Sequence, residues 1–310
     1  MPSDIQFRLL GALEVADGSS LISVGTIKSK SLLAILLLRA NDVVSTDSLV
    51  EELWAGSPPP SATATLRGYV SGLRDALEPG VRTGAHELLK TRPSGYLLAV
   101  APEQIDVGRF EMLVRTGREH LRRQQWDRAV TDFDQALALW RGPPLSDFGY
   151  QSFAQVEAAR LGEIRLSAEE GWMTAELALG NHHGVVAQLR ELASRAPLQE
   201  HLWGLLILAL YRCGRQGDAL RAYERLRRTL SDELGIEPSA ELRQLERAIL
   251  LQSDELIWQA PPESAKRPSP WRASSTSWPP TSPRVATSPA CTGAPTPRPP
   301  TSWARTWPSP

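Results

Sequence analysis

The chain has few of the features that mark secreted, membrane or metal-binding proteins. Among its 310 residues there are only two cysteines, Cys213 and Cys291, which excludes a disulfide framework and gives no metal-ligand spacing. The longest apolar run, Leu32 to Leu38, is far too short to span a bilayer. The N-terminus lacks the basic and apolar regions of a signal peptide. We therefore expect a cytoplasmic, multidomain protein without a membrane partner.

An excess of charge of one sign is also lacking, because the formal net charge is only −1. No global basic field is present to hold the whole chain on DNA or on an anionic membrane. Residues 261–310 carry six Lys or Arg against one acid, so the remainder is acidic, with 28 basic and 34 acidic side chains. Composition alone therefore does not indicate a nucleic-acid-binding protein.

Catalytic and cofactor-binding motifs are missing as well. The chain contains no P-loop, no nucleophile elbow and no glycine pattern of a dinucleotide-binding fold. Its five histidines show no metal-ligand spacing. Acidic neighbours such as Glu51 and Glu52 are adjacent on a helix, where they cannot converge on one substrate. We therefore expect no enzymatic activity, no cofactor and no bound metal.

What is present in the first hundred residues is a series of short strands and helices. Three β-like runs, FRLLG, ALEVADG and LISVG, precede a helix over about residues 26–39. A second helix lies at VVSTDSLVEELW, with Ser45 or Thr46 as its N-cap, and three prolines require a loop at AGSPPPSAT. A third helix over residues 65–80 and a hairpin at LLKTRPSGYLLAV complete the plan of a winged helix-turn-helix domain.

The helix over residues 65–80 decides how this domain is interpreted. Leu66, Val70, Leu73 and Leu77 form one apolar stripe, whereas the polar side holds little charge and two glycines. Alone, this pattern is typical of an amphipathic helix that covers a core. The helix before it and the hairpin after it favour a recognition helix that enters the major groove of DNA.

Residues from about 104 to 255 are almost entirely helical in pattern. Seven segments repeat with helical period, and Gly180, Gly214 and Gly235 are placed to end helices. Gly180 and Gly214 stand 34 residues apart and the segments after them can be overlaid, which is the period of the tetratricopeptide repeat. We expect an all-α, tetratricopeptide-like domain, for which both ligand binding and simple packing or dimerisation remain open.

The C-terminal segment has a third, different composition. Fourteen of the 25 prolines and five of the ten tryptophans occur from Trp258 onward, and residues 261–310 contain Val285 as their only Val, Ile, Leu, Phe, Tyr or Met. Such a segment cannot bury enough apolar surface to offset the loss of conformational entropy. The expected fold class is mixed, with an α+β winged helix at residues 1–102, an all-α repeat domain at 103–256 and a disordered tail at 257–310.

Several motifs in the first two regions resemble one known family. The segments are LLAILLLRANDVVSTDSLVEELW, TLRGYVSGLRDALEPG, LLKTRPSGYLL, IDVGRFEMLV and a long segment ending in RQLERAIL. In order and content they are similar to the motifs of Streptomyces antibiotic regulatory proteins. That family combines an OmpR-type winged helix with a bacterial transcriptional activation domain. The resemblance implies an activator of antibiotic biosynthetic genes. Its protomers would bind promoter direct repeats in double-stranded DNA as a tandem homo-oligomer and recruit RNA polymerase.

The resemblance also implies roles for three groups of residues. The family's groove-facing positions correspond to Arg67, Ser71, Gly72 and Arg74. Its phosphate contacts correspond to Thr65, Lys90 and Arg92. Its polymerase-contact loop corresponds to Ser57, Pro58, Pro59 and Pro60. Family members often carry Arg or Lys where this chain has Gly72 and Asp75, and phosphate contacts supply much of the binding energy, so affinity is expected to be low.

Two other interpretations start from the same sequence. The acidic balance and Asp75 suggest a scaffold or sensor whose winged helix has lost DNA binding. Larger relatives continue into a nucleotide-binding ATPase domain, and a two-base shift of a GC-rich coding sequence converts parts of the tail into its linker. On that hypothesis the tail is an out-of-frame translation, and the chain is a nonfunctional remnant of a longer regulator.

Overall fold

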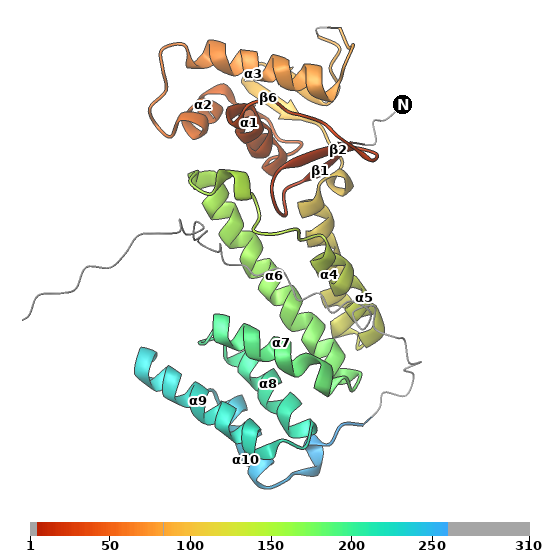
Figure 1. Ribbon diagram of the computed structural model, residues 1–310, viewed down its shortest axis with the longest axis vertical. Helices are drawn as coiled ribbons and strands as arrows, with labels where there is room; N and C mark the ends of the chain where they lie inside the picture. The colour runs from red at the N-terminus through yellow and green to blue at the C-terminus, as the bar shows by residue number, and fades with distance from the viewer. Residues whose placement is uncertain (1–4, 83, 260–310) are drawn as a thin grey trace, which may run out of the picture. The chain divides into compact units, whose positions relative to one another are not determined.

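A computed structural model describes residues 5–82 and 84–259 of the chain (Figure 1). The tail from residue 260 onward lies outside these residues, and so do Cys291, the out-of-frame hypothesis and all of the predicted disordered segment except residues 257–259. There the prediction is wrong at Trp258, whose Nε1 donates to the Ala178 carbonyl. Among the described residues, no helix combines the length and apolarity that are needed to cross a bilayer.

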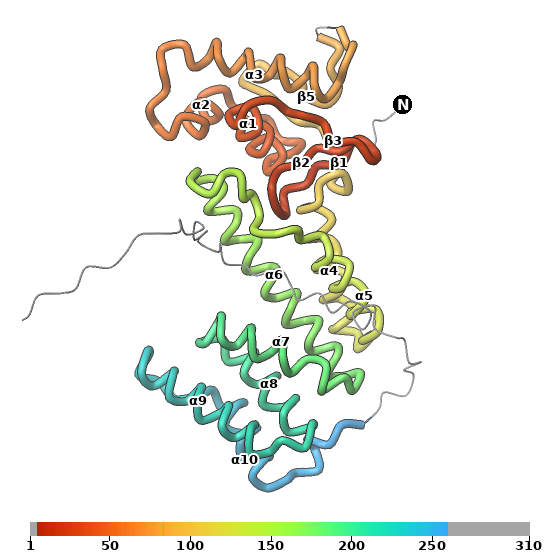
Figure 2. The backbone as a smooth tube through the Cα atoms, in the orientation of Figure 1, coloured from red at the N-terminus to blue at the C-terminus, as the bar shows by residue number. Residues whose placement is uncertain are grey.

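The chain begins with a small antiparallel sheet. β1 (Ile5–Arg8), β2 (Glu14–Asp17) and β3 (Ser20–Leu21) pair in sequence order (Figure 2). Ile5 and Phe7 of β1 are buried, because alternate side chains of a strand point to the same face. Each of the three predicted β-like runs overlaps a strand, but the limits differ: β1 starts two residues before FRLLG, and LISVG shares only Leu21 with β3.

Three helices follow the sheet, α1 (Ile27–Leu38), α2 (Thr46–Trp54) and α3 (Ala62–Leu77). The hydroxyl of Thr26 caps α1, and that of Ser45 caps α2 by accepting a hydrogen bond from Ser48 N, as the sequence predicted for one of two candidates. The apolar run of α1 lies in the centre of the core, with Leu32 to Leu37 at most 3% exposed.

The limits of α3 differ from the predicted residues 65–80. The helix starts three residues earlier, where Ala62 N donates to the carbonyl of Pro59, and it ends at Leu77 with Glu78 as C-cap. Pro79 and Gly80 lie beyond the helix, since proline cannot continue the backbone hydrogen bonds.

The predicted hairpin is present and acquires a third strand. β5 (Leu89–Arg92) and β6 (Gly95–Leu98) form the hairpin, and β4 (Val44–Ser45) pairs with the other side of β6. Gly95 is required at this junction, because a Cβ atom there would collide with the carbonyl oxygen of Val44. The winged helix-turn-helix plan is therefore confirmed, with β4 as an addition that no local sequence pattern indicated.

The second part of the described chain is helical, as predicted. A short turn, η1 (Pro102–Gln104), leads into it, and two more turns, η2 (Ser146–Phe148) and η3 (Asp254–Leu256), lie before α6 and after α10. Its α-helices are α4 (Asp106–Arg122), α5 (Trp126–Ala138), α6 (Ser152–Ala178), α7 (His182–Arg195), α8 (Glu200–Arg212), α9 (Gln216–Leu234) and α10 (Ala240–Leu250).

The predicted repeat is visible in the positions of α7 and α9. Gly180 and Gly214 precede these helices in the left-handed backbone conformation, with φ of 87° and 74°, which explains why glycine occurs at both sites. His182 and Gln216, the first residues of the two helices, are separated by the predicted offset.

Packing of α4, α5 and α6 centres on Phe133, which is fully buried. A Cβ atom at Gly117 of α4 would lie 2.9 Å from the Phe133 ring, and one at Gly171 of α6 would lie 2.6 Å from it. The two glycines thus allow the neighbouring helices to approach the aromatic ring closely.

A set of hydrogen bonds joins the helical part to the β1–β2 turn. The Asp106 carboxylate accepts hydrogen bonds from Leu9 N at 2.7 Å and from Leu10 N at 2.9 Å. Arg141 lies 3.8 Å from that carboxylate and 2.9 Å from Glu14. Burial raises the pKa of Asp106, while the two N–H donors and Arg141 act in the opposite direction. This junction ties the first sheet to α4.

Candidate nucleic-acid interface

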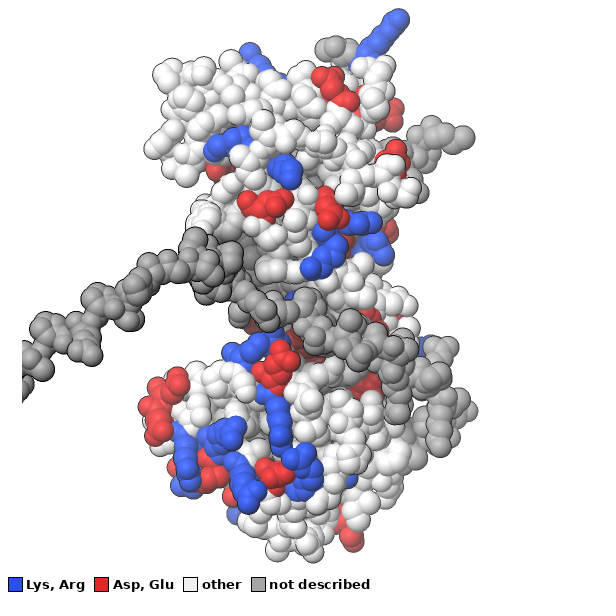
Figure 3. All heavy atoms as spheres, viewed as in Figure 1, with Lys and Arg blue, Asp and Glu red and all other residues white. Residues whose placement is uncertain are grey.

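The two faces of α3 have different exposures. Leu66, Val70, Leu73 and Leu77 are at most 3% exposed and hold the helix on the core. The opposite face presents few charges: in Figure 3 the atoms over α3, at the top of the view, are mostly white, whereas charged atoms gather over α9. The apolar stripe that the sequence predicted is confirmed, and so is the shortage of cations on the free face.

Three of the predicted groove-facing residues lie on the free face of α3. Arg67, Ser71 and Gly72 are exposed, and Gly68 is exposed beside them. A Cβ atom at Gly68 or Gly72 would meet no atom within 4 Å. Glycine lowers helix stability by about 1 kcal/mol relative to alanine, and packing among the described residues explains neither position. The bare backbone leaves room for a close approach by another molecule.

Arg74, the fourth predicted groove-facing residue, is directed elsewhere in the structure. Its Nε donates to the carbonyl of Leu89 at 2.9 Å, and its Nη2 donates to the Thr91 hydroxyl at 2.8 Å. Both acceptors belong to β5 of the wing. In this conformation Arg74 connects α3 to the wing, and two of its five N–H donors are used inside the chain.

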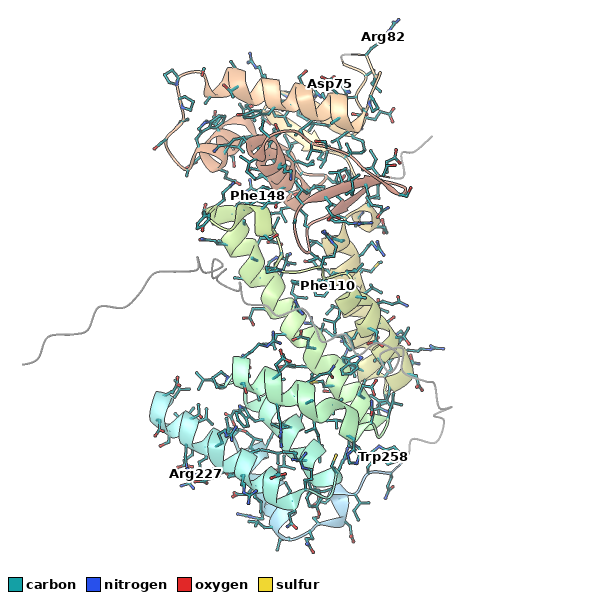
Figure 4. All side chains as sticks on the ribbon, in the orientation of Figure 1. Asp75, Arg82, Phe110, Phe148, Arg227 and Trp258 are labelled. Carbon is teal, nitrogen blue, oxygen red and sulfur yellow. The ribbon has the colours of Figure 1, made fainter. Side chains whose placement is uncertain are left out.

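A second connection lies one turn further on, at Glu78. Its Oε1 accepts hydrogen bonds from Glu87 N at 2.8 Å and Leu88 N at 3.2 Å, and its Oε2 lies 3.4 Å from Nδ1 of His86. Arg74 and Glu78 together fix the end of α3 against the start of the wing. Asp75, labelled in Figure 4, is exposed and lies one turn after Ser71 on the free face of α3.

The three predicted phosphate contacts differ in their surroundings. Thr65 is partly buried, and its hydroxyl donates to the Ser61 carbonyl at 3.0 Å. Lys90 and Arg92 lie two residues apart on β5 and share the face opposite to Thr91, since strand side chains alternate. Arg92 is exposed and Lys90 is partly buried. The wing therefore presents its cations away from the contact with α3.

The predicted polymerase-contact loop is an exposed turn between α2 and α3. Ser57 to Pro60 are all exposed, and Ala55 and Gly56 before them have positive φ values of 49° and 79°. Three consecutive residues without an N–H group leave this segment with few internal hydrogen bonds. Its side chains are accessible to a partner.

Sequence reasoning missed the residues that orient α3. Thr91 and Glu78 are polar residues in unremarkable positions, and their partners lie 17 and 9 residues away in the chain. The alternation of β5 is the one available signal, because it places Thr91 on the same face as buried Leu89.

A helix-turn-helix whose last helix is held against a β-hairpin wing is the architecture of a DNA-binding transcriptional regulator. Comparison with known proteins agrees. Residues 24–98 match the family described as "Transcriptional regulatory protein, C terminal", and residues 105–250 match "Bacterial transcriptional activator domain".

Individual relatives extend over both parts. The chain is 39% identical over 250 residues to Regulatory protein DnrI of Streptomyces peucetius, covering 79% of this chain and 92% of DnrI. It is 36% identical to Transcriptional regulatory protein EmbR of Mycobacterium tuberculosis, covering 80% of this chain but 64% of EmbR. The solved structure of that EmbR in complex with a low affinity phosphopeptide superimposes with a TM-score of 0.76 at 35% identity, over 81% of this chain and 66% of the other.

The chain therefore belongs to the family of Streptomyces antibiotic regulatory proteins, as its motifs predicted. It is a transcriptional regulator of the same type as DnrI, and the relatives that it matches are named as regulators rather than as enzymes. Among the described residues, no group of three His, Cys, Asp or Glu side chains is arranged to hold a metal ion.

Proposed function

We propose that the protein is a sequence-specific activator that binds promoter direct repeats through α3 and the wing. The observation that carries this proposal is the exposed face of α3, where Arg67 and Ser71 flank the backbone of Gly68 and Gly72. No contact with the part of the chain that the structure describes requires glycine at these sites, whereas binding in a groove of DNA requires close approach. Arg92 of the wing supplies a phosphate contact beside the groove.

Arg74 has a different role in this proposal from the one that the family pattern implies. Its two hydrogen bonds to β5 hold α3 and the wing at one angle, so that base and phosphate contacts form together. It acts as a positioning residue for the interface. Direct readout then depends on Arg67 and Ser71, which is a small set for one protomer.

A small set of contacts favours binding of protomers in tandem. Two protomers on direct repeats double the contacts without any new residue, and the second binds at a raised effective concentration. The helical part at residues 103–256 would stabilise this arrangement. The exposed Ser57–Pro60 loop would meet RNA polymerase, and the target genes, as for the family, would be those of antibiotic biosynthesis.

A gel-shift titration tests the proposal. The full chain is mixed with promoter DNA that carries direct repeats, and with the same DNA in which half a helical turn has been inserted between the repeats. Cooperative, competitor-resistant binding to the first DNA alone supports tandem recognition. Binding to both DNAs that is no stronger than binding to random DNA at moderate salt supports the scaffold or sensor interpretation instead.

Run-off transcription from the same promoter then tests the loop. The P58S/P59S/P60S variant is expected to bind DNA like the wild-type protein but to lose activation. Equal activation by both proteins would contradict the assigned role of the loop.

A further inference from the structure

A hollow of about 490 Å³ lies between the start of α7, the end of α8 and the segment after α10. This volume is within the range of small-molecule sites, which is about 300–1,000 Å³. The residues that matter for its chemistry are His182, Tyr211, Arg212, Leu256, Ile257 and Trp258. None of them belongs to α3, the wing or the Ser57–Pro60 loop.

Trp258, labelled in Figure 4, lines the hollow and packs against the end of α6 and the start of α7. Its Nε1 donates to the carbonyl of Ala178 at 2.8 Å, at the end of α6. Its ring contacts the His182 ring edge-on, with centroids 5.7 Å apart. A Cβ atom at Gly180 would lie 2.6 Å from the Trp258 ring, so glycine is needed to admit the indole. Trp258, which the sequence assigned to the tail, is thus part of the helical packing.

Arg212 brings a positive charge to the hollow, and among the described residues no carboxylate pairs with it. Its Nε donates to the Leu256 carbonyl at 3.2 Å. Burial lowers the pKa of Arg212, because the charged form loses solvent. A partly buried guanidinium with open Nη groups is costly unless an anion arrives.

His182 provides a second unsatisfied group. Its side chain is 8% exposed, and neither ring nitrogen has a hydrogen-bond partner in the described structure. A neutral imidazole offers one donor and one acceptor, and leaving both unpaired costs stability. Buried polar groups of native proteins are nearly always paired, so an imidazole of this kind at the wall of a hollow indicates a missing partner.

We infer that this hollow binds a small organic carboxylate with a flat apolar body. The carboxylate would pair with the Nη groups of Arg212, whose planar fork suits two carboxylate oxygens. The flat body would lie against the rings of His182 and Trp258 and against Ile257. The inference does not depend on DNA binding, because the site and the proposed interface share no residue.

Isothermal titration calorimetry of the full chain tests the inference, with naphthalene-2-carboxylate as the probe. Its neutral amide, naphthalene-2-carboxamide, and inorganic phosphate are the comparison ligands. We expect one carboxylate to bind per chain. The amide lacks the negative charge and phosphate lacks the apolar body, so each should bind at least roughly tenfold more weakly than the carboxylate. Phosphate binding as tight as that of the carboxylate would show a site for inorganic anions and overturn the inference.

Variants locate the binding. Arg212→Gln should weaken carboxylate binding by roughly tenfold or more, and Trp258→Ala should weaken it through the apolar wall. Arg215→Gln is the matched control, because Arg215 is exposed and pairs with Asp218 at 2.7 Å. Thermal unfolding establishes that each variant is folded.

The NMR signal of the His182 imidazole gives a second measurement of binding that does not depend on calorimetry. The His182 signal, assigned by its loss in His182→Gln, should shift on saturation with the carboxylate, and the other four histidines should not. The inference is overturned if millimolar carboxylate gives no saturable binding, if Arg212→Gln binds like the wild-type protein, or if His182 does not respond.

Discussion

The Nη2 atom of Arg74 lies 2.8 Å from the Thr91 hydroxyl, so that a side chain of α3 is hydrogen-bonded to a side chain of the wing. The same guanidinium donates to the Leu89 carbonyl. An arginine whose place in the motif indicates a DNA contact therefore helps Glu78 to hold the helix against the hairpin. The distinction between reading and positioning can be measured.

Replacing the acceptor separates these two roles of Arg74. Thr91→Val removes the hydroxyl and leaves every side chain of α3 unchanged. If Arg74 positions the wing, both Thr91→Val and Arg74→Met should weaken promoter binding, the first by about threefold and the second by more, because a net hydrogen bond is worth about 1 kcal/mol. Fluorescence anisotropy with labelled promoter DNA provides the measurement.

The two variants give a different result if Arg74 contacts DNA directly. If Arg74 reads bases, Thr91→Val binds like the wild-type protein and Arg74→Met alone loses affinity.

The open space at Gly72 predicts a gain of DNA affinity. A Cβ atom at this position would lie more than 4 Å from every atom of the described residues. Gly72→Arg should raise affinity for promoter and random DNA alike and steepen the dependence of log K on log salt by about 1, since one more phosphate is neutralised. Gly72→Ala is the control, which stabilises the helix by up to about 1 kcal/mol without adding charge. An unchanged salt slope for Gly72→Arg would place position 72 away from DNA.

Two glycines of α6 should respond oppositely to the same substitution. Gly171→Ala puts a methyl group 2.6 Å from the Phe133 ring and should lower the free energy of unfolding by about 1–3 kcal/mol through overpacking. Gly162→Ala meets open space on the same helix and should raise it by up to about 1 kcal/mol. Urea unfolding followed by circular dichroism measures both, and equal effects would contradict the close packing of α5 against α6.

His182 predicts a pH dependence of stability. Burial lowers its pKa from 6.5 to about 4, with smaller contributions from Arg212 and His183. Between these values the unfolded chain binds a proton that the folded chain does not, so the unfolding free energy should rise as pH increases from about 4 to 6.5 and level off above. Because solvent at the hollow screens part of the effect, we expect a rise of about 2 kcal/mol.

Two variants isolate that contribution. His182→Gln should flatten the rise between pH 4 and 6.5, whereas His183→Gln, which changes the exposed neighbour, should retain it. The assignment fails if both variants show the wild-type slope.

Local patterns predicted most of the fold. The stripe from Leu66 to Leu77 indicated α3, the cap Ser45 indicated where α2 begins, and Gly180 and Gly214 indicated the repeat. Each of these signals operates within a few residues of the chain, which is why one sequence suffices to read it.

Contacts between distant residues were not predictable in this way. The pairing of β4 with Gly95, the hydrogen bonds of Arg74 to β5 and those of Asp106 to Leu9 join segments between 15 and 97 residues apart. The local sequence of one segment does not indicate which distant segment it contacts. Arg74 shows this most clearly. The family motif indicates that it contacts DNA, whereas the fold places the Leu89 carbonyl and the Thr91 hydroxyl where they accept its hydrogen bonds.

The central claim is that the exposed face of α3 reads promoter sequence. It is tested most directly by the ratio of dissociation constants for promoter and scrambled DNA, measured at one salt concentration for the wild-type protein, Arg67→Ala and Arg243→Ala. Arg243 is an exposed arginine of α10 and serves as the matched control. We predict that Arg67→Ala reduces the ratio roughly tenfold, since a base contact contributes about 1–3 kcal/mol of discrimination, and that Arg243→Ala leaves it unchanged. A ratio near one for the wild-type protein, or an equal ratio for wild type and Arg67→Ala, would contradict this account.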